Sequence, residues 1–256
     1  RGAERLRRRG VAVVGGVEMA ACAELIAAFA SVARRGRPLV TLKLAATLDG
    51  RIATRSGASR WITGAPARQM VHRLRDQADA VMVGAGTVRA DDPLLTCRLP
   101  RGRDPLRVVV DGRLRVPLTA RVLTNDSARG TLLATVMTKG RKLETLRRRG
   151  VSVEVLPGRA GVLSLRRLLE RLAARGVHSV LIEGGAGLAA AALRERVVDR
   201  LLLFIAPRLI GGDGRGLLGP LGVATMGDAL GLRIERVSRI GDDWLVRAVP
   251  EDAHAV

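Results

Sequence analysis

The stretch Ser179-Val180-Leu181-Ile182-Glu183-Gly184-Gly185-Ala186-Gly187 begins as a short apolar strand, passes through a carboxylate and paired glycines, and leads into a helix that extends to about Arg194. The same order of strand and helix recurs along the chain. Apolar strands are predicted at 39–45, 80–83, 107–110, 131–135, 151–155 and 201–205, and helices at 63–76, 141–149 and 164–175. Strands that alternate with helices predict an α/β fold with a mainly parallel sheet flanked by helices.

The end of the chain follows a different pattern. Residues 232–240 and 244–249 lie on either side of Gly241-Asp242 and are predicted to form an antiparallel hairpin. A hairpin added to parallel strands makes the sheet mixed.

The beginning of the chain reads as a separate piece. A basic start is followed by a short apolar run, a Gly15-Gly16 turn and a helical pattern over 18–35, which Gly36-Arg37-Pro38 interrupts. The chain also begins at Arg1 without Met, as a piece of a longer protein would. We therefore predict a boundary between residues 1–37 and a larger domain, residues 38–256.

The composition limits the classes of function. The formal net charge is +20, but 41 of the 44 basic residues are Arg and they are scattered over nearly every segment. Aromatic residues, on which single-stranded nucleic acids stack, make up only 2% of the chain. This pattern argues against a nucleic-acid-binding protein and remains compatible with anionic small-molecule ligands.

The sequence also argues against a metal site, a disulfide and a secreted or membrane-spanning protein. Cys22 and Cys97 are far apart and belong to no C-x-x-C pair or Cys/His cluster, so neither a metal site nor a disulfide is predicted. No secretory signal is visible, and the longest apolar runs, such as 201–207, are too short to span a bilayer. We therefore expect a cytoplasmic protein.

The first candidate ligand site is the glycine run after Glu183. In open α/β sheets, ligands bind beyond the carboxyl ends of the strands, and glycines allow backbone N–H groups to approach a phosphate. Gly185, Gly187 and Ala190 satisfy a G-x-G-x-x-A pattern, but it lies late in the chain and no acidic residue ends the next strand. A plain strand-to-helix turn is the alternative interpretation; the carboxylate of Glu183 favours a ligand site.

Two further candidates lie in the first half of the chain. Gly84-Ala85-Gly86-Thr87 again leaves backbone donors open and is followed by Asp91-Asp92-Pro93, although an Asp turn before Pro is an equally good reading. Lys43 lies on an apolar strand of a chain that otherwise uses Arg, which indicates that a compact ammonium with a tunable pKa is needed there. A surface lysine is the alternative. Polar residues in the same region add to the pattern: Ser59, Trp61, Arg75 and Arg98.

Taken in order and spacing, these motifs closely resemble the reductase domain of the bifunctional riboflavin-biosynthesis deaminase/reductase. The resemblance covers residues 38–249 and rests on the segments 42–51, 59–63, 84–96, 183–185 and 205–212. Residues 1–37 resemble the tail of the deaminase domain in that family. The zinc signature of the deaminase, H-x-E with P-C-x-x-C, is not in this sequence, so deaminase activity is not expected.

The resemblance implies a fold similar to dihydrofolate reductase, a homodimer, and NADPH-dependent reduction of 5-amino-6-(5-phosphoribosylamino)uracil at C1′ of its sugar. Carried over by position, the substrate would be held by Ser59, Arg75, Leu95, Arg98 and Glu183, with Arg75 and Arg98 assigned to its phosphate. NADPH would be held by Ala45, Trp61, Thr87, Asp91, Gly185, Ala186, Gly187, Leu188, Ala189, Ala190 and Ala191. The family often has Ser where this chain has Gly112, which removes one expected cofactor contact.

Three side chains are assigned to catalysis as hypotheses. Ring opening requires a proton donor near the sugar ring oxygen, and an imine becomes more electrophilic when it is protonated or lies beside a carboxylate. We expect Lys43 to transfer or share that proton, Glu183 to contact the ribityl hydroxyls or nitrogen, and Asp91 to orient both ligands. The alternatives are a related reductase acting on another pyrimidine or pterin, and an inactive or nucleic-acid-binding fragment.

Overall fold

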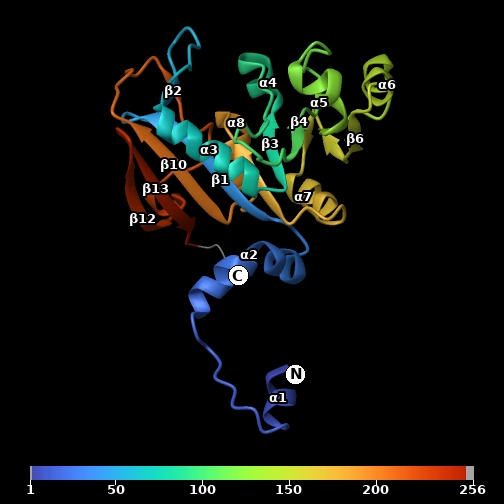
Figure 1. Cartoon of the computed structure of the whole chain (residues 1–256). Coiled ribbons are helices and arrows are strands. Elements are labelled where there is room, and N and C mark those ends of the chain that lie inside the picture. Colours follow the sequence, from blue (N-terminus) through green and yellow to red (C-terminus); the bar gives the residue numbers. More distant parts are fainter. Residues whose placement is uncertain (1, 252–256) are drawn as a thin grey trace.

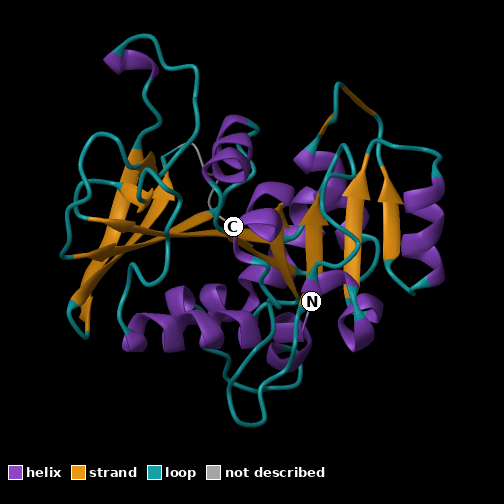
Figure 2. Cartoon of the chain, turned by 90° about the horizontal axis from the view of Figure 1, so that it is seen from above, coloured by secondary structure: helices purple, strands orange, loops and turns teal. Residues whose placement is uncertain are grey.

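The predicted strands assemble into a nine-stranded sheet with helices on both faces (Figures 1 and 2). The structure is a computed structural model and describes residues 2–251. The order of strands across the sheet is β12-β13-β10-β1-β9-β3-β4-β5-β6. Their bounds are Leu39–Thr47 for β1, Ala80–Gly84 for β3, Leu106–Val110 for β4, Thr131–Thr135 for β5, Ser152–Val155 for β6, Ser179–Glu183 for β9, Arg200–Ala206 for β10, Leu232–Ile240 for β12 and Asp243–Pro250 for β13.

The sheet is mixed and mostly parallel, as predicted. Every neighbouring pair from β10 through β6 is parallel, and the C-terminal hairpin of β12 and β13 joins β10 antiparallel at one edge. The chain first adds strands outward from β3 to β6, then returns to insert β9 between β1 and β3 and to place β10 beyond β1. Ligands of open α/β sheets bind where the direction of strand addition reverses, which here is at β1, β9 and β3.

Two layers of helices enclose this sheet. Helices α7 (Leu165–Ala173) and α8 (Ala186–Arg194) cover one face and share a buried cluster with Val40, Leu42 and Leu44 of β1. Helices α3 (Ala65–Gln77), α4 (Ala85–Asp91) and α6 (Arg141–Arg148) pack on the other face. Because strand side chains alternate between faces, Lys43 points to the α3 side, where its Nζ lies 5.7 Å from the centre of the Phe204 ring.

The N-terminal part lies mostly away from the sheet. Helix α1 (Gly2–Arg7) and the segment after it extend outward, and α2 (Met19–Arg35) reaches the body near its C-terminal end (Figure 1). Ala27, Ala30 and Ser31 are its buried residues. None of the helices in residues 2–251 has the length and apolarity needed to cross a lipid bilayer.

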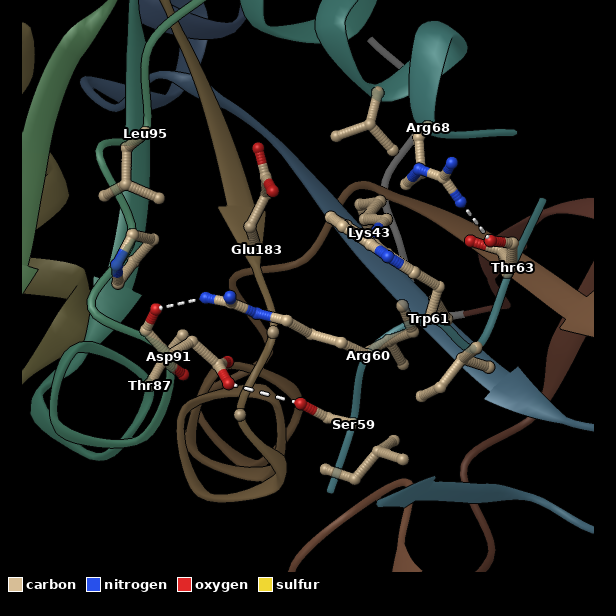
Figure 3. A pocket seen from close by; sticks show the side chains of 18 of the residues that line it. Lys43, Ser59, Arg60, Trp61, Thr63, Arg68, Thr87, Asp91, Leu95 and Glu183 are labelled. Carbon is tan, nitrogen blue, oxygen red and sulfur yellow. Dashed lines mark hydrogen bonds between the residues drawn. The ribbon is translucent and has the colours of Figure 1, made fainter. Parts of the chain in front are cut away.

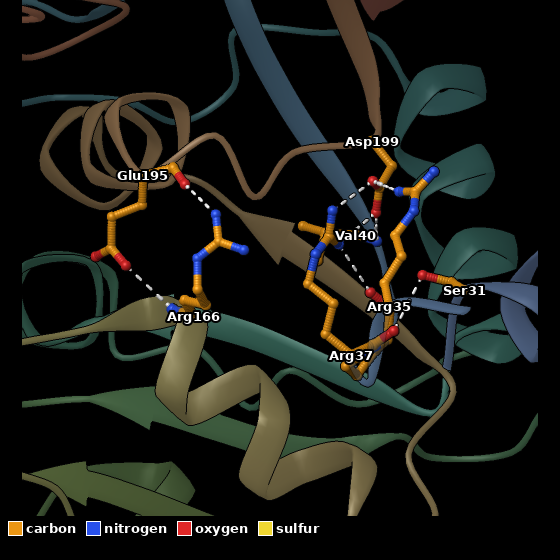
Figure 4. Close-up of polar contacts among 8 residues, drawn as sticks. Ser31, Arg35, Arg37, Val40, Arg166, Glu195 and Asp199 are labelled. Carbon is orange, nitrogen blue, oxygen red and sulfur yellow. Dashed lines mark hydrogen bonds and ion pairs between the residues drawn. The ribbon is translucent and has the colours of Figure 1, made fainter. Parts of the chain in front are cut away.

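Asp199 anchors the junction between α2 and the sheet (Figure 4). Its carboxylate accepts hydrogen bonds from Arg35, from both terminal nitrogens of Arg37 at 2.7 Å, and from the backbone N–H of Val40 at 2.8 Å. The side chain of Asp199 is 5% exposed, so these donors replace the water that it loses on burial.

Some local predictions differ from the structure. Thr63 was the predicted cap of α3, but the helix begins at Ala65 after Gly64, whose N–H donates to Asp243 at 2.7 Å. The Gly-x-Gly loop at 84–87 proves to be the start of α4, because its two glycines are followed by residues that continue a helical turn. Short elements were also missed: β2 (Arg51–Ala53), β7 (Gly158–Arg159), β8 (Val162–Leu163), β11 (Arg215–Gly216), α5 (Asn125–Arg129) and two 3-10 turns, Arg121–Leu123 and Met226–Asp228.

Candidate active site

A cavity of about 680 Å³ opens at the reversal point of the sheet, on the α3 side (Figure 3). Its walls come from the ends of β1 and β9, the inner side of α3, the start of α4 and the loops 52–63 and 91–98. Segments far apart in the sequence therefore meet in one space large enough for a small-molecule ligand.

Lys43 and Glu183 form the floor of this cavity. They are register partners on the parallel strands β1 and β9, and both side chains point to the same face of the sheet. The parallel pairing accounts for their proximity, because it brings the carboxyl end of β9 beside the middle of β1. An ammonium and a carboxylate are thus held side by side in the interior.

Arg75 reaches Glu183 from α3. Its Nε donates to Oε1 at 2.6 Å and its Nη2 to Oε2 at 2.8 Å, while Nη1 donates to the backbone oxygen of Thr96 at 3.0 Å. The two side chains are 14% and 10% exposed. This two-point contact fixes the direction of the carboxylate.

The electrostatics of this cluster keep its acid ionised. Burial by itself raises the pKa of Glu183, but the hydrogen bonds and charge of Arg75, together with Lys43 and His72, bring that pKa below its ordinary value. Burial lowers the pKa of Lys43; the charge of Glu183 opposes this shift and that of Arg75 adds to it. Lys43 therefore releases its proton more readily than a surface lysine, as a proton-transfer group requires.

The opposite wall is held together by Asp91. Its Oδ1 accepts from the Ser59 hydroxyl at 3.2 Å, and its backbone oxygen accepts from Arg60 at 2.9 Å (Figure 3). Beside them, the guanidinium of Arg68 stacks 4.4 Å from the centre of the Trp61 ring. These contacts fix the loop that carries Ser59 and Trp61 against the C-terminal end of α4.

The glycines after Glu183 form a cradle at the start of α8. Gly184 and Gly185 have φ of +67° and +79°, which favour glycine, and a Cβ on Gly185 would lie 2.7 Å from Oγ1 of Thr87. A backbone without side chains therefore borders the cavity at a helix N-terminus, where backbone N–H groups and the helix dipole attract phosphate. The residues present fit the phosphates of a nicotinamide cofactor.

Most of the predicted site residues line this one cavity. They are Lys43, Ala45, Ser59, Trp61, Arg75, Thr87, Asp91, Leu95, Arg98, Glu183 and Gly185. The six further residues assigned to the cofactor, Ala186 to Ala191, lie in α8 outside the cavity wall. Leu188, Ala189 and Ala190 are buried, so this part of α8 can offer a cofactor only the backbone N–H groups of its first turn.

Among the lining residues that the sequence reasoning missed are four basic ones: Arg60, Arg68, His72 and Arg121. In a chain with 44 basic residues, single arginines give no signal. His72 is one of only three histidines and precedes Arg75 by one helical turn, which was a usable signal.

The arginine side chains that line the cavity fall into two groups. Within residues 2–251, the guanidinium groups of Arg98 and Arg121 have no hydrogen-bond or ion-pair partner, whereas those of Arg60, Arg68 and Arg75 do. Arg121 is held by its backbone N–H, which donates to Asp92 Oδ1 at 2.8 Å. Two cations are therefore free to meet anionic groups of ligands.

Comparison with known proteins identifies the family of the chain. Residues 38–246 match the family model described as the RibD C-terminal domain. The chain belongs to this family. A curated relative, the riboflavin biosynthesis protein RibD of Actinobacillus pleuropneumoniae, is 39% identical over 247 residues, which cover 96% of this chain and 66% of the relative. The RibD of Escherichia coli is 35% identical and is covered to 70%. The chain thus spans about two thirds of the length of the relatives it matches.

Solved structures of the family superpose closely. RibD of Acinetobacter baumannii gives a TM-score of 0.84 at 32% identity, with 98% of this chain and 68% of that chain covered. A Thermotoga maritima protein described as a diaminohydroxyphosphoribosylaminopyrimidine deaminase/5-amino-6-(5-phosphoribosylamino)uracil reductase gives 0.84 at 30% identity, with 98% and 67% covered. The predicted membership of the family is confirmed.

Proposed function

We propose that the chain is a 5-amino-6-(5-phosphoribosylamino)uracil reductase that uses NADPH. One observation carries the proposal: the half-buried Lys43 and the buried Glu183, paired in register, share a single cavity with the glycine cradle at Gly185. The descriptions of relatives, which give riboflavin biosynthesis and this reductase activity, support it.

The reaction that these residues would serve has two stages. In the first, the sugar ring oxygen gains a proton, its bond to C1′ breaks, and the nitrogen loses its proton to form a C1′=N imine. In the second, C1′ accepts a hydride and the nitrogen accepts a proton. A bound nicotinamide supplies the hydride, and the protein supplies the protons and the alignment.

Each polar residue of the cluster has a role in this scheme. The Lys43 ammonium donates the proton that opens the ring, because its lowered pKa favours release. The Glu183 carboxylate, which Arg75 keeps ionised, stabilises the positive charge that develops at C1′ and the nitrogen. Asp91, fixed by Ser59, orients the ligands at the opposite wall.

We assign the two free cations to two anions. Arg98 would bind the substrate phosphate, together with the two N–H donors of Arg75 that Glu183 and Thr96 leave unused. Arg121 would bind the 2′-phosphate that distinguishes NADPH from NADH, since its backbone is held by Asp92 and its guanidinium lines the cavity without a partner in residues 2–251.

We further propose that residues 1–37 are the tail of a deaminase domain and 38–256 the reductase domain. Leu25 and Phe29 of α2 are 85% and 67% exposed, as expected for a helix that packs on another domain, and the family match begins at residue 38.

A cytoplasmic homodimer completes the proposal. Ile234 and Val237 of β12, 61% and 52% exposed, support a second copy at that edge of the sheet.

The direct test is NADPH oxidation with 5-amino-6-(5-phosphoribosylamino)uracil as substrate, with the ribitylamino product identified by mass spectrometry. We expect turnover that requires both ligands. Saturable quenching of Trp61 fluorescence by NADPH without turnover would instead favour a related reductase with another pyrimidine or pterin substrate. The absence of both quenching and turnover would contradict the proposed function.

A further inference from the structure

His72 lies inside the cavity and has no task in the reaction described above. It stands on α3 directly before Arg73 and three residues before Arg75, and it contacts Cys97 and Arg98 of the neighbouring loop. Its Nδ1 accepts the backbone N–H of Arg98 at 3.3 Å, and its backbone oxygen accepts the thiol of Cys97 at 3.6 Å. The backbone of Arg98 is therefore tied to α3 through an imidazole.

The segment 95–98 has few other supports. Leu95 has φ of +58°, an unfavourable conformation for leucine, although its side chain is buried. Arg75 Nη1 holds the Thr96 oxygen, and the backbone N–H of Cys97 donates to Asp104 at 2.7 Å. At Arg98 the only contact of the backbone N–H is the one to His72, and the guanidinium has no partner within residues 2–251.

The charge state of His72 suits this contact. Desolvation lowers its pKa, and the charges of Arg75 and Arg98 lower it further, while Glu183 and the backbone of Thr96 act in the opposite direction. The net shift is downward from 6.5, so the imidazole is neutral at pH 7. A neutral ring offers one nitrogen as an acceptor, whereas a protonated ring offers none.

From this geometry we infer that His72 is a positioning residue that sets the place of Arg98 for the phosphate of the substrate. This inference rests on the proposed function for the identity of the substrate. On this inference, His72 affects the binding of the substrate phosphate. It does not affect the hydride-transfer step, which takes place at Lys43 and Glu183.

The first experiment compares three variants of the full chain. His72→Leu removes the acceptor and keeps a similar volume, whereas His72→Asn restores an acceptor near the position of Nδ1. We expect His72→Leu to raise the KM for the phosphorylated substrate about tenfold, the effect of losing a charge-positioning contact of about 1.4 kcal/mol, with kcat within twofold. His72→Asn should recover most of that loss. Arg73→Ala, an exposed cation on the same helix, is the matched control and should change neither constant.

A double-mutant cycle with Arg98→Ala separates positioning from direct contact. If His72 acts through Arg98, His72→Leu should add nothing to the KM of the Arg98→Ala variant. Additive effects of the two substitutions, or a fall in kcat that His72→Asn does not reverse, would overturn the inference.

A binding measurement keeps the test independent of turnover. Ribose 5-phosphate titrated by calorimetry should bind about tenfold more weakly to His72→Leu than to the wild-type chain, and ribose should bind equally to both. If the wild-type chain bound ribose 5-phosphate but did not oxidise NADPH, the proposed function would fail while the role of His72 stood. Equal ribose 5-phosphate affinity in the two proteins would overturn the role of His72 alone.

Discussion

Arg75 and Glu183, 108 residues apart in the sequence, are joined by two hydrogen bonds of 2.6 and 2.8 Å in the floor of the cavity. Both were predicted to hold the substrate, and the structure shows that they also hold each other. This contact keeps a buried carboxylate ionised and pointed in one direction, next to Lys43. Among residues 2–251, it also leaves the guanidinium of Arg98 as the cation without a partner at that end of the site.

Replacing Glu183 by Gln should lower kcat by about 100-fold or more, because the amide cannot stabilise positive charge at the reacting carbon. Steady-state rates with both ligands saturating test this. Glu170→Gln, an exposed change on α7, should leave kcat unchanged. A Glu183→Gln variant with wild-type kcat would remove Glu183 from the mechanism.

Replacing Lys43 by Met should abolish most turnover and yet stabilise the fold at neutral pH. Burial lowers the pKa of Lys43 from 10.5, so below that value the unfolded chain binds the proton more readily than the folded protein does. The protonated lysine therefore destabilises the fold, and this cost fades as the pH rises through the folded-state pKa. Met has similar volume and no charge to bury.

The measurement is the thermal midpoint of both proteins at several pH values. We expect the variant to exceed the wild type by a few degrees at pH 7, since about 1 kcal/mol corresponds to about 2–4 °C for a domain of this size. The difference should shrink as the pH approaches 10.5. A lower midpoint for Lys43→Met at pH 7 would mean that the ammonium stabilises the fold through Glu183.

Replacing Gly185 by Ala should weaken NADPH binding by about tenfold or more. The added Cβ would lie 2.7 Å from Thr87 Oγ1 at a positive φ, which forces the cradle to change shape. Quenching of the intrinsic tryptophan fluorescence by NADPH measures the Kd. Gly86→Ala is the control, because a Cβ there meets nothing within 4 Å and its φ is not positive. Equal Kd values for the Gly185→Ala variant and the wild type would place the cofactor elsewhere.

Replacing Arg121 by Ala should raise the KM for NADPH about tenfold and leave the KM for NADH unchanged, because only NADPH carries the 2′-phosphate. A second readout needs no turnover: adenosine 2′,5′-bisphosphate and adenosine 5′-monophosphate are each tested as competitors of NADPH binding, and only the first should bind more weakly to the variant. Arg129→Ala, which removes an exposed charge at the end of α5 that does not line the cavity, is the matched control. An equal rise in KM for both cofactors would mean that Arg121 contacts a part of the cofactor that NADPH and NADH share.

The sequence predicted local structure well where the pattern was strong. The apolar strands and the amphipathic helices α6 and α7 appear within one or two residues of their predicted bounds, because burial of one face fixes their periodicity. Glycine-rich segments were less predictable. The start of α4, directly after Gly84, read as an open loop, and β2 and β11 were missed because two- and three-residue strands leave no periodicity.

The sequence by itself determined the class of fold, the family and the presence of an unusual lysine on an apolar strand. Only the tertiary structure decided how these parts meet. The insertion of β9 beside β1 places Glu183 against Lys43, and the packing of α3 on that face brings Arg75 and His72 to the same carboxylate. Such contacts depend on strand order and helix packing, which are set by burial over the whole chain, so no local pattern of residues contains them.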